Sequence, residues 1–133
     1  MNAPPDGSSD HPETFDLDDI EDARQRLRGV IRATPTVHSN AFSDLVGRPV
    51  YFKPEHFQRT GSFKIRGAYN RISRIAEAGD ASEVVAASAG NHAQGVALAA
   101  ALSGLRATIF MPSAASLPKV SATRQYGAEV VLG

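Results

Sequence analysis

The chain has 133 residues, of which 42% are hydrophobic and 21% charged, the balance of an ordinary globular domain. Its 14 basic and 14 acidic residues cancel, so bulk charge does not favour a nucleic-acid or membrane partner. Cysteine is absent, which excludes disulfides, thiolate nucleophiles and Cys-ligated zinc, and no apolar run approaches the roughly 18 residues of a membrane span.

The N-terminal stretch MNAPPDGSSDHPETF is rich in Pro, Gly, Ser and Asp and lacks the apolar segment of a secretory signal. We therefore predict a disordered tail over residues 1–17 and a cytoplasmic protein. The following segment has apolar residues at helical spacing, namely Ile20, Ala23, Leu27, Val30 and Ile31. This spacing predicts a helix that ends before Pro35. A turn-rich stretch then leads to VYFK, residues 50–53, which is typical of a strand.

The rest of the chain alternates between helical and strand patterns. Ser62 is the expected N-cap of a helix that ends at Gly79. Strand patterns then occur over 83–88, 106–111 and 128–132. Helical patterns over 93–104 and 117–127 lie between them. This order predicts the α/β class, with a parallel sheet, helices on its faces and right-handed crossovers.

Lys64 lies in GSFKIRGA, residues 61–68, at the expected start of a helix. A cation there faces the positive end of the helix dipole, and Arg66 is close by, so the position is unfavourable unless a neutral amine is needed. Schiff-base chemistry needs such an amine, because only the free amine attacks a carbonyl. Phe63 beside it offers a flat apolar surface for an aromatic cofactor. The alternative is a partly exposed lysine without a function.

The segment SAGNHAQG, residues 88–95, lies between a predicted strand and a predicted helix. Small residues allow the backbone to approach a ligand closely, and the N–H groups at a helix start bind anions. Asn91 can donate or accept, so it suits a phenolic oxygen or a carboxylate. The alternative is a turn in which Ser88 and Asn91 only cap the helix.

Other kinds of site have little support in the sequence. The four histidines do not show the i, i+4 spacing of a helical metal pair, and no carboxylate cluster completes a metal site. No G-x-S-x-G elbow of a serine hydrolase and no glycine-rich nucleotide-binding motif occurs. We therefore predict no metal.

Three segments together resemble the pyridoxal-phosphate enzymes of the tryptophan-synthase-β-like fold, also called fold type II. They are KPEHFQRTGSFKIRGAYNRI, SAGNHAQGVALAAALSG and FMPSAASLPKVSATRQYGAEVVL. The resemblance extends over residues 18–133 and is strongest to threonine dehydratases, or threonine ammonia-lyases. The motif SFKIRGA resembles the corresponding motif of the dehydratase and serine-racemase branch. Cysteine and threonine synthases usually have an acidic residue where this chain has Ile65.

This resemblance implies pyridoxal 5'-phosphate as the cofactor. Lys64 corresponds to the lysine that binds the cofactor covalently and acts as the catalytic base. Phe63 corresponds to the ring packed against the cofactor, and Asn91 to the residue that meets the pyridine 3'-oxygen.

The resemblance also implies a substrate-binding loop, which receives the carboxylate of an amino acid. Its residues are Ser88, Ala89, Gly90, Asn91 and His92. Racemases of this branch have a serine in place of Ala89, which serves as a second acid-base group. Alanine cannot do this, so the difference favours elimination over racemisation.

Members of this group are more than twice as long as this chain. Their glycine-rich phosphate loop and the partner of the pyridine nitrogen lie beyond the position of Gly133. We therefore expect residues 18–133 to be the N-terminal part of a catalytic domain, truncated after the third strand of its small domain. The 133-residue chain by itself is expected to be inactive.

The complete enzyme implied by the resemblance converts L-threonine to 2-oxobutanoate and ammonia. It is expected to be a cytoplasmic homo-oligomer of amino-acid metabolism, in isoleucine biosynthesis, without nucleic-acid or membrane partners. A serine racemase or serine dehydratase is one alternative, and a non-catalytic fragment or partner-binding truncation is another. The sequence does not distinguish threonine from serine, because the residues around the substrate side chain are not identifiable.

Overall fold

The computed structural model describes residues 15–133, so most of the predicted tail, residues 1–14, lies outside the described residues. The elements in chain order are α1 (Leu17–Arg26), β1 (Val37–His38), α2 (Asn40–Val46), β2 (Tyr51–Phe52), the short 3-10 helix η1 (Glu55–Phe57), α3 (Lys64–Ala78), β3 (Glu83–Ala87), α4 (Asn91–Leu102), β4 (Arg106–Met111), α5 (Leu117–Gln125) and β5 (Glu129–Leu132). None of the described helices is long and apolar enough to cross a membrane.

Helix α1 is shorter than the apolar spacing predicts. It begins after Asp16, whose side chain accepts a hydrogen bond from the Asp19 N–H at 3.0 Å in a reciprocal capping box. It ends at Arg26 because the chain turns at Gly29, where φ is 75°, a left-handed conformation that favours glycine. The predicted continuation to Pro35 is therefore wrong.

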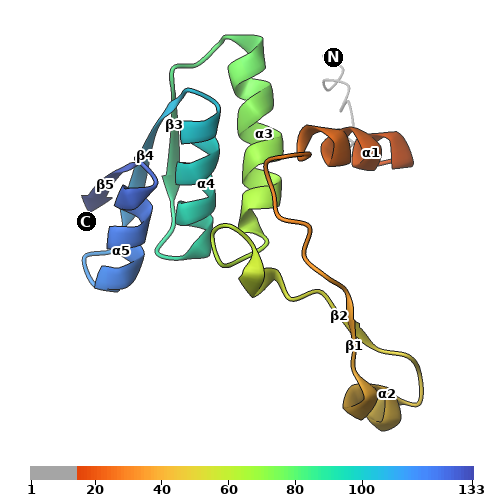
Figure 1. Cartoon of the computed structure of the whole chain (residues 1–133). Helices are drawn as coiled ribbons and strands as arrows, with labels where there is room; N and C mark the ends of the chain where they lie inside the picture. Colours follow the sequence, from red (N-terminus) through yellow and green to blue (C-terminus); the bar gives the residue numbers. More distant parts are fainter. Residues whose placement is uncertain (1–14) are drawn as a thin grey trace, which may run out of the picture.

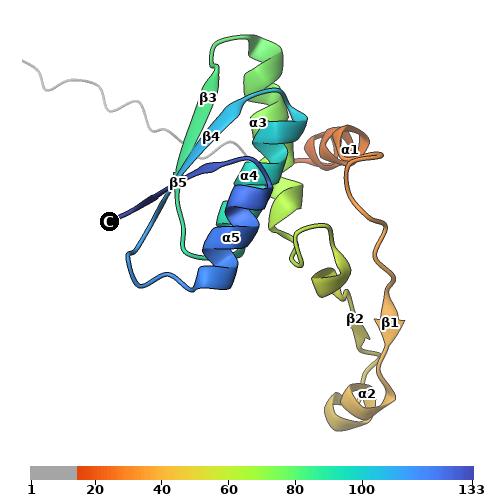
Figure 2. The ribbon, with the colours of Figure 1, turned by 60° about the vertical axis from the view of Figure 1, so that its left-hand side comes forward.

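Residues 37–52 form an arm that projects from the rest of the molecule (Figures 1 and 2). Strands β1 and β2 pair antiparallel, with Val37 opposite Phe52, and α2 connects them. The strand at residues 50–53 was predicted, whereas its partner and α2 were not. Helix α2 nevertheless has local signals, because the Ser39 side chain caps its start and Gly47 ends it with φ 69°.

The second half of the chain is the predicted α/β unit. Strands β3, β4 and β5 form a parallel sheet in that order, and Ala86 pairs with Ile109, which pairs with Val130. Helices α4 and α5 pack on one face of this sheet and α3 packs against α4 (Figure 2). Helix α4 is buried over residues 93–100 because it lies between α3, α5 and the sheet. The opposite face of the sheet exposes Val85 and Phe110.

The direction of the strands and helices determines where a site can form. Strands β3 and β4 run toward the end of the molecule at which α3, α4 and α5 begin (Figure 1). The carboxyl ends of parallel strands are the usual location of ligand sites in open α/β sheets. The N-termini of α3, α4 and α5 lie at the same end, where the positive ends of the helix dipoles favour an anionic ligand.

Candidate active site at the helix N-termini

Lys64 is the first residue of α3. The preceding Phe63 already has helical angles and occupies the cap position, so Ser62 is not the N-cap that the sequence predicts. The Ser62 hydroxyl still accepts a hydrogen bond from the Lys64 N–H at 3.4 Å. Ser62 is buried, whereas Phe63 and Lys64 are exposed at the surface of this end of the molecule.

The amine of Lys64 differs from the amines of the other two lysines. Lys53 Nζ donates to the Thr34 carbonyl oxygen at 2.6 Å, and Lys119 Nζ donates to Asn91 Oδ1 at 2.5 Å. Within residues 15–133, Lys64 Nζ makes no hydrogen bond or ion pair, and it lies 5.1 Å from the centroid of the Phe63 ring. Lys64 is therefore the lysine whose amine is available to a ligand.

The predicted substrate loop begins where β3 ends. The Ser88 N–H donates to the Phe110 carbonyl oxygen at 3.0 Å, which continues the pairing of β3 with β4. Ser88 Oγ accepts from the Gly90 N–H at 3.2 Å, so this hydroxyl orders the turn itself. Gly90 is the N-cap of α4, and Ala89 is exposed beside it.

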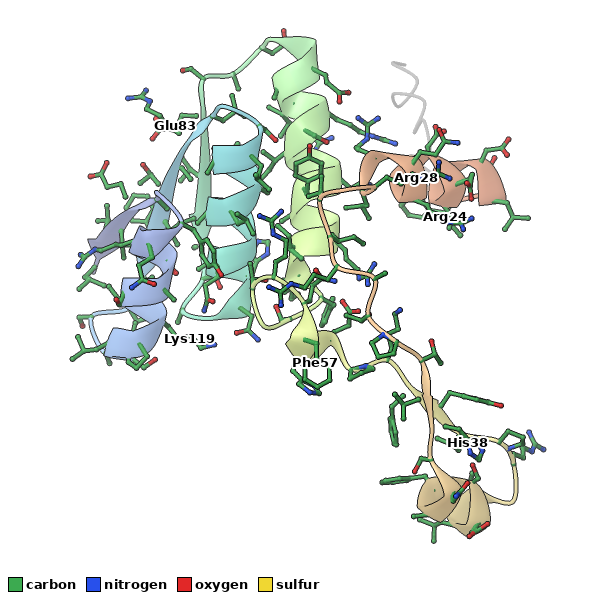
Figure 3. All side chains as sticks on the ribbon, viewed as in Figure 1. Arg24, Arg28, His38, Phe57, Glu83 and Lys119 are labelled. Atoms are coloured by element: carbon green, nitrogen blue, oxygen red, sulfur yellow. The ribbon has the colours of Figure 1, made fainter. Side chains whose placement is uncertain are left out.

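Helix α4 begins at Asn91, two residues before the predicted start at residue 93. Asn91 is therefore inside the helix and does not cap it. The alternative prediction, in which Asn91 only caps the helix, is wrong. Its side chain instead receives the ammonium group of Lys119, in the first turn of α5 (Figure 3). Because lysine only donates, the Asn91 amide must turn its oxygen toward Lys119 and is left with its N–H donors for a ligand.

The contact with Lys119 was not anticipated. A signal for it exists in the sequence, since Lys119 lies in the first turn of a helix that follows the neighbouring strand of the sheet. That place brings it to the same end of the sheet as Asn91.

Gly95 brings α4 close to the start of α3. A Cβ atom at Gly95 would lie 3.1 Å from the Lys64 carbonyl carbon and 3.2 Å from the Ile65 nitrogen. Such distances are below ordinary van der Waals contact with backbone atoms that cannot easily move. Asn91 precedes Gly95 by one helical turn and so lies on the same face of α4. Gly95 thus places the predicted substrate loop beside Lys64, a packing role that its presence in a small-residue segment did not reveal.

We expect Gly95→Ala to destabilise the protein despite the better helix propensity of alanine. Overpacking typically costs about 1–3 kcal/mol, whereas the propensity gain is about 1 kcal/mol. Gly67→Ala in α3 is the control, because nothing lies within 4 Å of a Cβ atom there, and it should stabilise by about 0.5–1 kcal/mol. Urea unfolding of both variants in the full-length gene product tests this. Equal stabilisation by both would show that α4 has room to move.

His92 is exposed and borders a cavity of about 450 Å³ between α3, β3 and α4. The cavity is lined mostly by apolar residues such as Ile72, Val84 and Val96. Across residues 15–133, no group of three His, Asp or Glu side chains is arranged to hold a metal ion.

Arg66 has a carboxylate partner of its own. Its Nε and Nη2 atoms donate to the two carboxylate oxygens of Glu55, each at 2.8 Å. The hydrogen bonds from Arg66 lower the pKa of Glu55 from 4.5 to about 2, and the same contact raises the pKa of Arg66. The charge of Arg66 is therefore matched by Glu55.

Comparisons with known proteins place this geometry in a family. Residues 27–133 match the family described as "Pyridoxal-phosphate dependent enzyme". The chain is 51% identical over 116 residues to an L-threonine ammonia-lyase of Thermotoga maritima, covering 87% of this chain and 29% of the relative. It is 50% identical over 123 residues to the Escherichia coli L-threonine dehydratase catabolic TdcB, covering 90% of this chain and 37% of the relative.

A solved structure of maize serine racemase is also similar, with a TM-score of 0.80 and 39% identity over 88% of this chain and 36% of that one. The chain thus spans about a third of the length of the proteins that it matches. The match nonetheless includes α3, α4, α5 and the three-stranded sheet, and it confirms the expected fold type II architecture. The chain belongs to the pyridoxal-phosphate dependent enzyme family.

Proposed function

We propose that the complete protein is a threonine ammonia-lyase, which converts L-threonine to 2-oxobutanoate and ammonia. The observation that carries the proposal is the free amine of Lys64 at the start of α3, beside the N-terminus of α4. The relatives named L-threonine ammonia-lyase and L-threonine dehydratase, at about half identity, support the choice of substrate.

The residues at this end of the molecule suit pyridoxal phosphate. Lys64 has an amine that can condense with the aldehyde of the cofactor. The exposed Phe63 ring next to it offers a face on which a planar cofactor ring can pack. The Asn91 amide, turned by Lys119, offers an N–H donor that suits an anionic ring oxygen. When bound, pyridoxal phosphate serves as an electron sink for the bond that breaks at the α-carbon.

The chain's own residues then have distinct tasks. We assign to Lys64 the covalent hold on the cofactor and, once its amine is released, removal of the α-proton of the substrate. The loop from Ser88 to His92 would receive the substrate carboxylate, because the first N–H groups of α4 lack partners within the helix. The close packing at Gly95 keeps the base near the α-carbon of a substrate so bound.

A serine racemase is the second candidate, and the similarity to the maize enzyme favours it. Ala89 argues against it, because a methyl group cannot serve as the second acid-base group that the resemblance to racemases implies at this position. The Ala89 side chain is exposed in the loop between β3 and α4, and the hydroxyl of the adjacent Ser88 accepts a hydrogen bond from the Gly90 N–H.

We expect the full-length gene product to release 2-oxobutanoate from L-threonine, and pyruvate from L-serine, without forming D-serine. Turnover would be followed by the 2-oxo acid formed, and the remaining serine by chiral chromatography. Ala89→Ser is the informative variant, since it restores the hydroxyl and should allow some D-serine to form. Formation of D-serine by the unaltered protein, at a rate comparable with that of the 2-oxo acid, would favour the racemase.

We also propose that the enzyme works in the cytoplasm and supplies 2-oxobutanoate for isoleucine synthesis. A catabolic role is the alternative, as the name of the E. coli relative indicates for that protein. A requirement for isoleucine after deletion of the gene would support the biosynthetic role. A homo-oligomeric state stays a prediction, to be checked by light scattering of the purified protein.

A further inference from the structure

The segment that leads to Lys64 is irregular but contains buried polar side chains. Residues 58–63 connect η1 to α3 without regular secondary structure. Three polar side chains in this segment are nevertheless buried, with exposures of 2% for Gln58, 4% for Thr60 and 7% for Ser62. Buried polar groups of this kind are costly unless they have partners, so the segment is expected to adopt one defined path.

Thr60 finds its partner within the segment, since its hydroxyl donates to the Ser62 carbonyl oxygen at 3.5 Å, whereas the partners of Gln58 come from the stretch before β1. Gln58 Nε2 donates to the Arg32 carbonyl oxygen at 2.9 Å, and Gln58 Oε1 accepts from the Arg32 N–H at 2.8 Å. Lys53 Nζ donates to the carbonyl oxygen of Thr34, and the Thr34 hydroxyl donates to Glu55 Oε1 at 2.5 Å. Beyond Lys64, Arg66 Nη2 donates to the Thr34 hydroxyl at 3.5 Å, so residues on both sides of Lys64 contact the same short stretch.

Glu55 and Arg66 enclose Lys64 along the chain. Glu55 precedes the irregular segment and Arg66 lies in the first turn of α3, so their two parallel hydrogen bonds close a loop that contains Lys64. The pair is largely shielded from solvent, with side-chain exposures of 14% for Glu55 and 30% for Arg66. Forked pairs of this geometry fix orientation as well as distance, and a lysine in place of the arginine cannot reproduce it.

We propose that Glu55 and Arg66 are positioning residues for Lys64, an inference that rests on the proposed function. They act through the backbone, because residues two apart on a helix point to different sides and Arg66 does not face the Lys64 amine. The fork and the Thr34 hydroxyl hold the first turn of α3 against the stretch before β1. This contact determines where the Lys64 side chain begins, and so where its amine lies relative to Asn91 and the N-terminus of α4.

The chain contains a matched control for this idea. Glu77, near the other end of α3, accepts two hydrogen bonds from Arg26 of α1, each at 2.7 Å. Both bonds come from Arg26 Nη1, and this pair also ties α3 to the N-terminal part of the chain, but it lies thirteen residues from Lys64, about 20 Å along the helix. Glu77→Gln therefore weakens a second arginine–carboxylate pair of α3, one that is more exposed to solvent, without disturbing the path to Lys64.

The experiment compares Glu55→Gln, Arg66→Lys and Glu77→Gln in the full-length protein. The first readout is the attachment of pyridoxal 5'-phosphate, trapped with borohydride and located by mass spectrometry at Lys64, Lys53 or Lys119. The second is kcat and KM with L-threonine. We expect the Glu55 and Arg66 variants to lose about tenfold to a hundredfold in kcat, with KM nearly unchanged, and to lose selectivity for Lys64 in trapping. Glu77→Gln should stay within about twofold.

Each outcome is informative. Unchanged kcat and trapping in Arg66→Lys, or equal losses in Glu77→Gln, would overturn the proposal and leave the fork with a role in stability alone. If Glu55→Gln does not fold, Arg66→Lys decides, because it keeps the charge and loses only the fork. An unaltered protein that turns over no threonine but is trapped selectively at Lys64 would refute the proposed function, and the trapping arm would still test the positioning role.

Discussion

Replacement of Lys64 by alanine is expected to abolish the lyase activity of the full-length protein, by at least about 1,000-fold. A general base contributes typically 100–10,000-fold, and Lys64 is also assigned the covalent hold on the cofactor. The visible absorption of bound pyridoxal phosphate should disappear together with the activity. Borohydride trapping should leave no label on the peptide that carries residue 64.

Two controls separate this role from a general loss of lysine. Lys53→Met removes an amine that already donates to a carbonyl oxygen, and Lys119→Met removes the amine bound to Asn91. Both should keep the label on Lys64, although Lys119→Met should weaken cofactor binding because the Asn91 amide is then free to turn over. A Lys64→Ala protein that keeps its absorption, or a label that forms on Lys53 or Lys119 of the unaltered protein, would remove the assignment.

The sequence predicts the α/β half of the molecule well because its signals there are local. Short apolar runs indicate the strands, and glycines mark the helix ends. Gly79 and Gly104 stop α3 and α4 as predicted, with φ values of 74° and 72°. Helix α4 (12 residues) carries five alanines, at positions 93, 97, 99, 100 and 101, so it is recognisable from composition. The order of strands and helices then implies the parallel sheet.

The N-terminal half was predicted less well, since its structure depends on pairings with distant residues. Strands β1 and β2 have two residues each, too few for an alternating pattern, and they pair across α2. Helix α1 has apolar residues at helical spacing beyond its end, but Gly29 turns the chain before they can continue it. The turn decides the helix end, and the spacing does not reveal it.

The candidate site shows the same division. The residues around Lys64 and Asn91 were identified from their types and from the family resemblance, and their positions at adjacent helix starts follow from the topology. The contacts that support them were not identified. Glu55 and Arg66 are eleven positions apart, and Gly95 contacts Lys64 from another helix, so no periodicity links them. Such contacts depend on how elements pack, which a single sequence does not specify.

The fork between Glu55 and Arg66 also leads us to expect a loss of stability in acid. The pKa of Glu55 is lowered from 4.5 to about 2, first because Arg66 donates to its carboxylate, and the Thr34 hydroxyl adds to this. A carboxyl group with a lowered pKa in the folded state stabilises the protein fully above its ordinary pKa. This stabilisation is lost as the pH falls from about 4.5 to about 2. The shift corresponds to about 3 kcal/mol in total, of which about 2 kcal/mol is lost by pH 3.

Urea unfolding at pH 7 and pH 3 tests this, with Glu55→Gln as the variant that cannot titrate at this position. At pH 7 the unaltered full-length protein should be the more stable by about 2–3 kcal/mol, because Arg66 loses its partner in the variant. At pH 3 this difference should shrink by about 2 kcal/mol, whatever other carboxylates contribute, since they titrate in both proteins. Glu77→Gln is the control; Glu77 is 63% exposed, and its pair should contribute little and change little with pH. A difference between the unaltered protein and Glu55→Gln that stays constant from pH 7 to pH 3 would show that the Glu55 carboxylate is not held by Arg66 in solution.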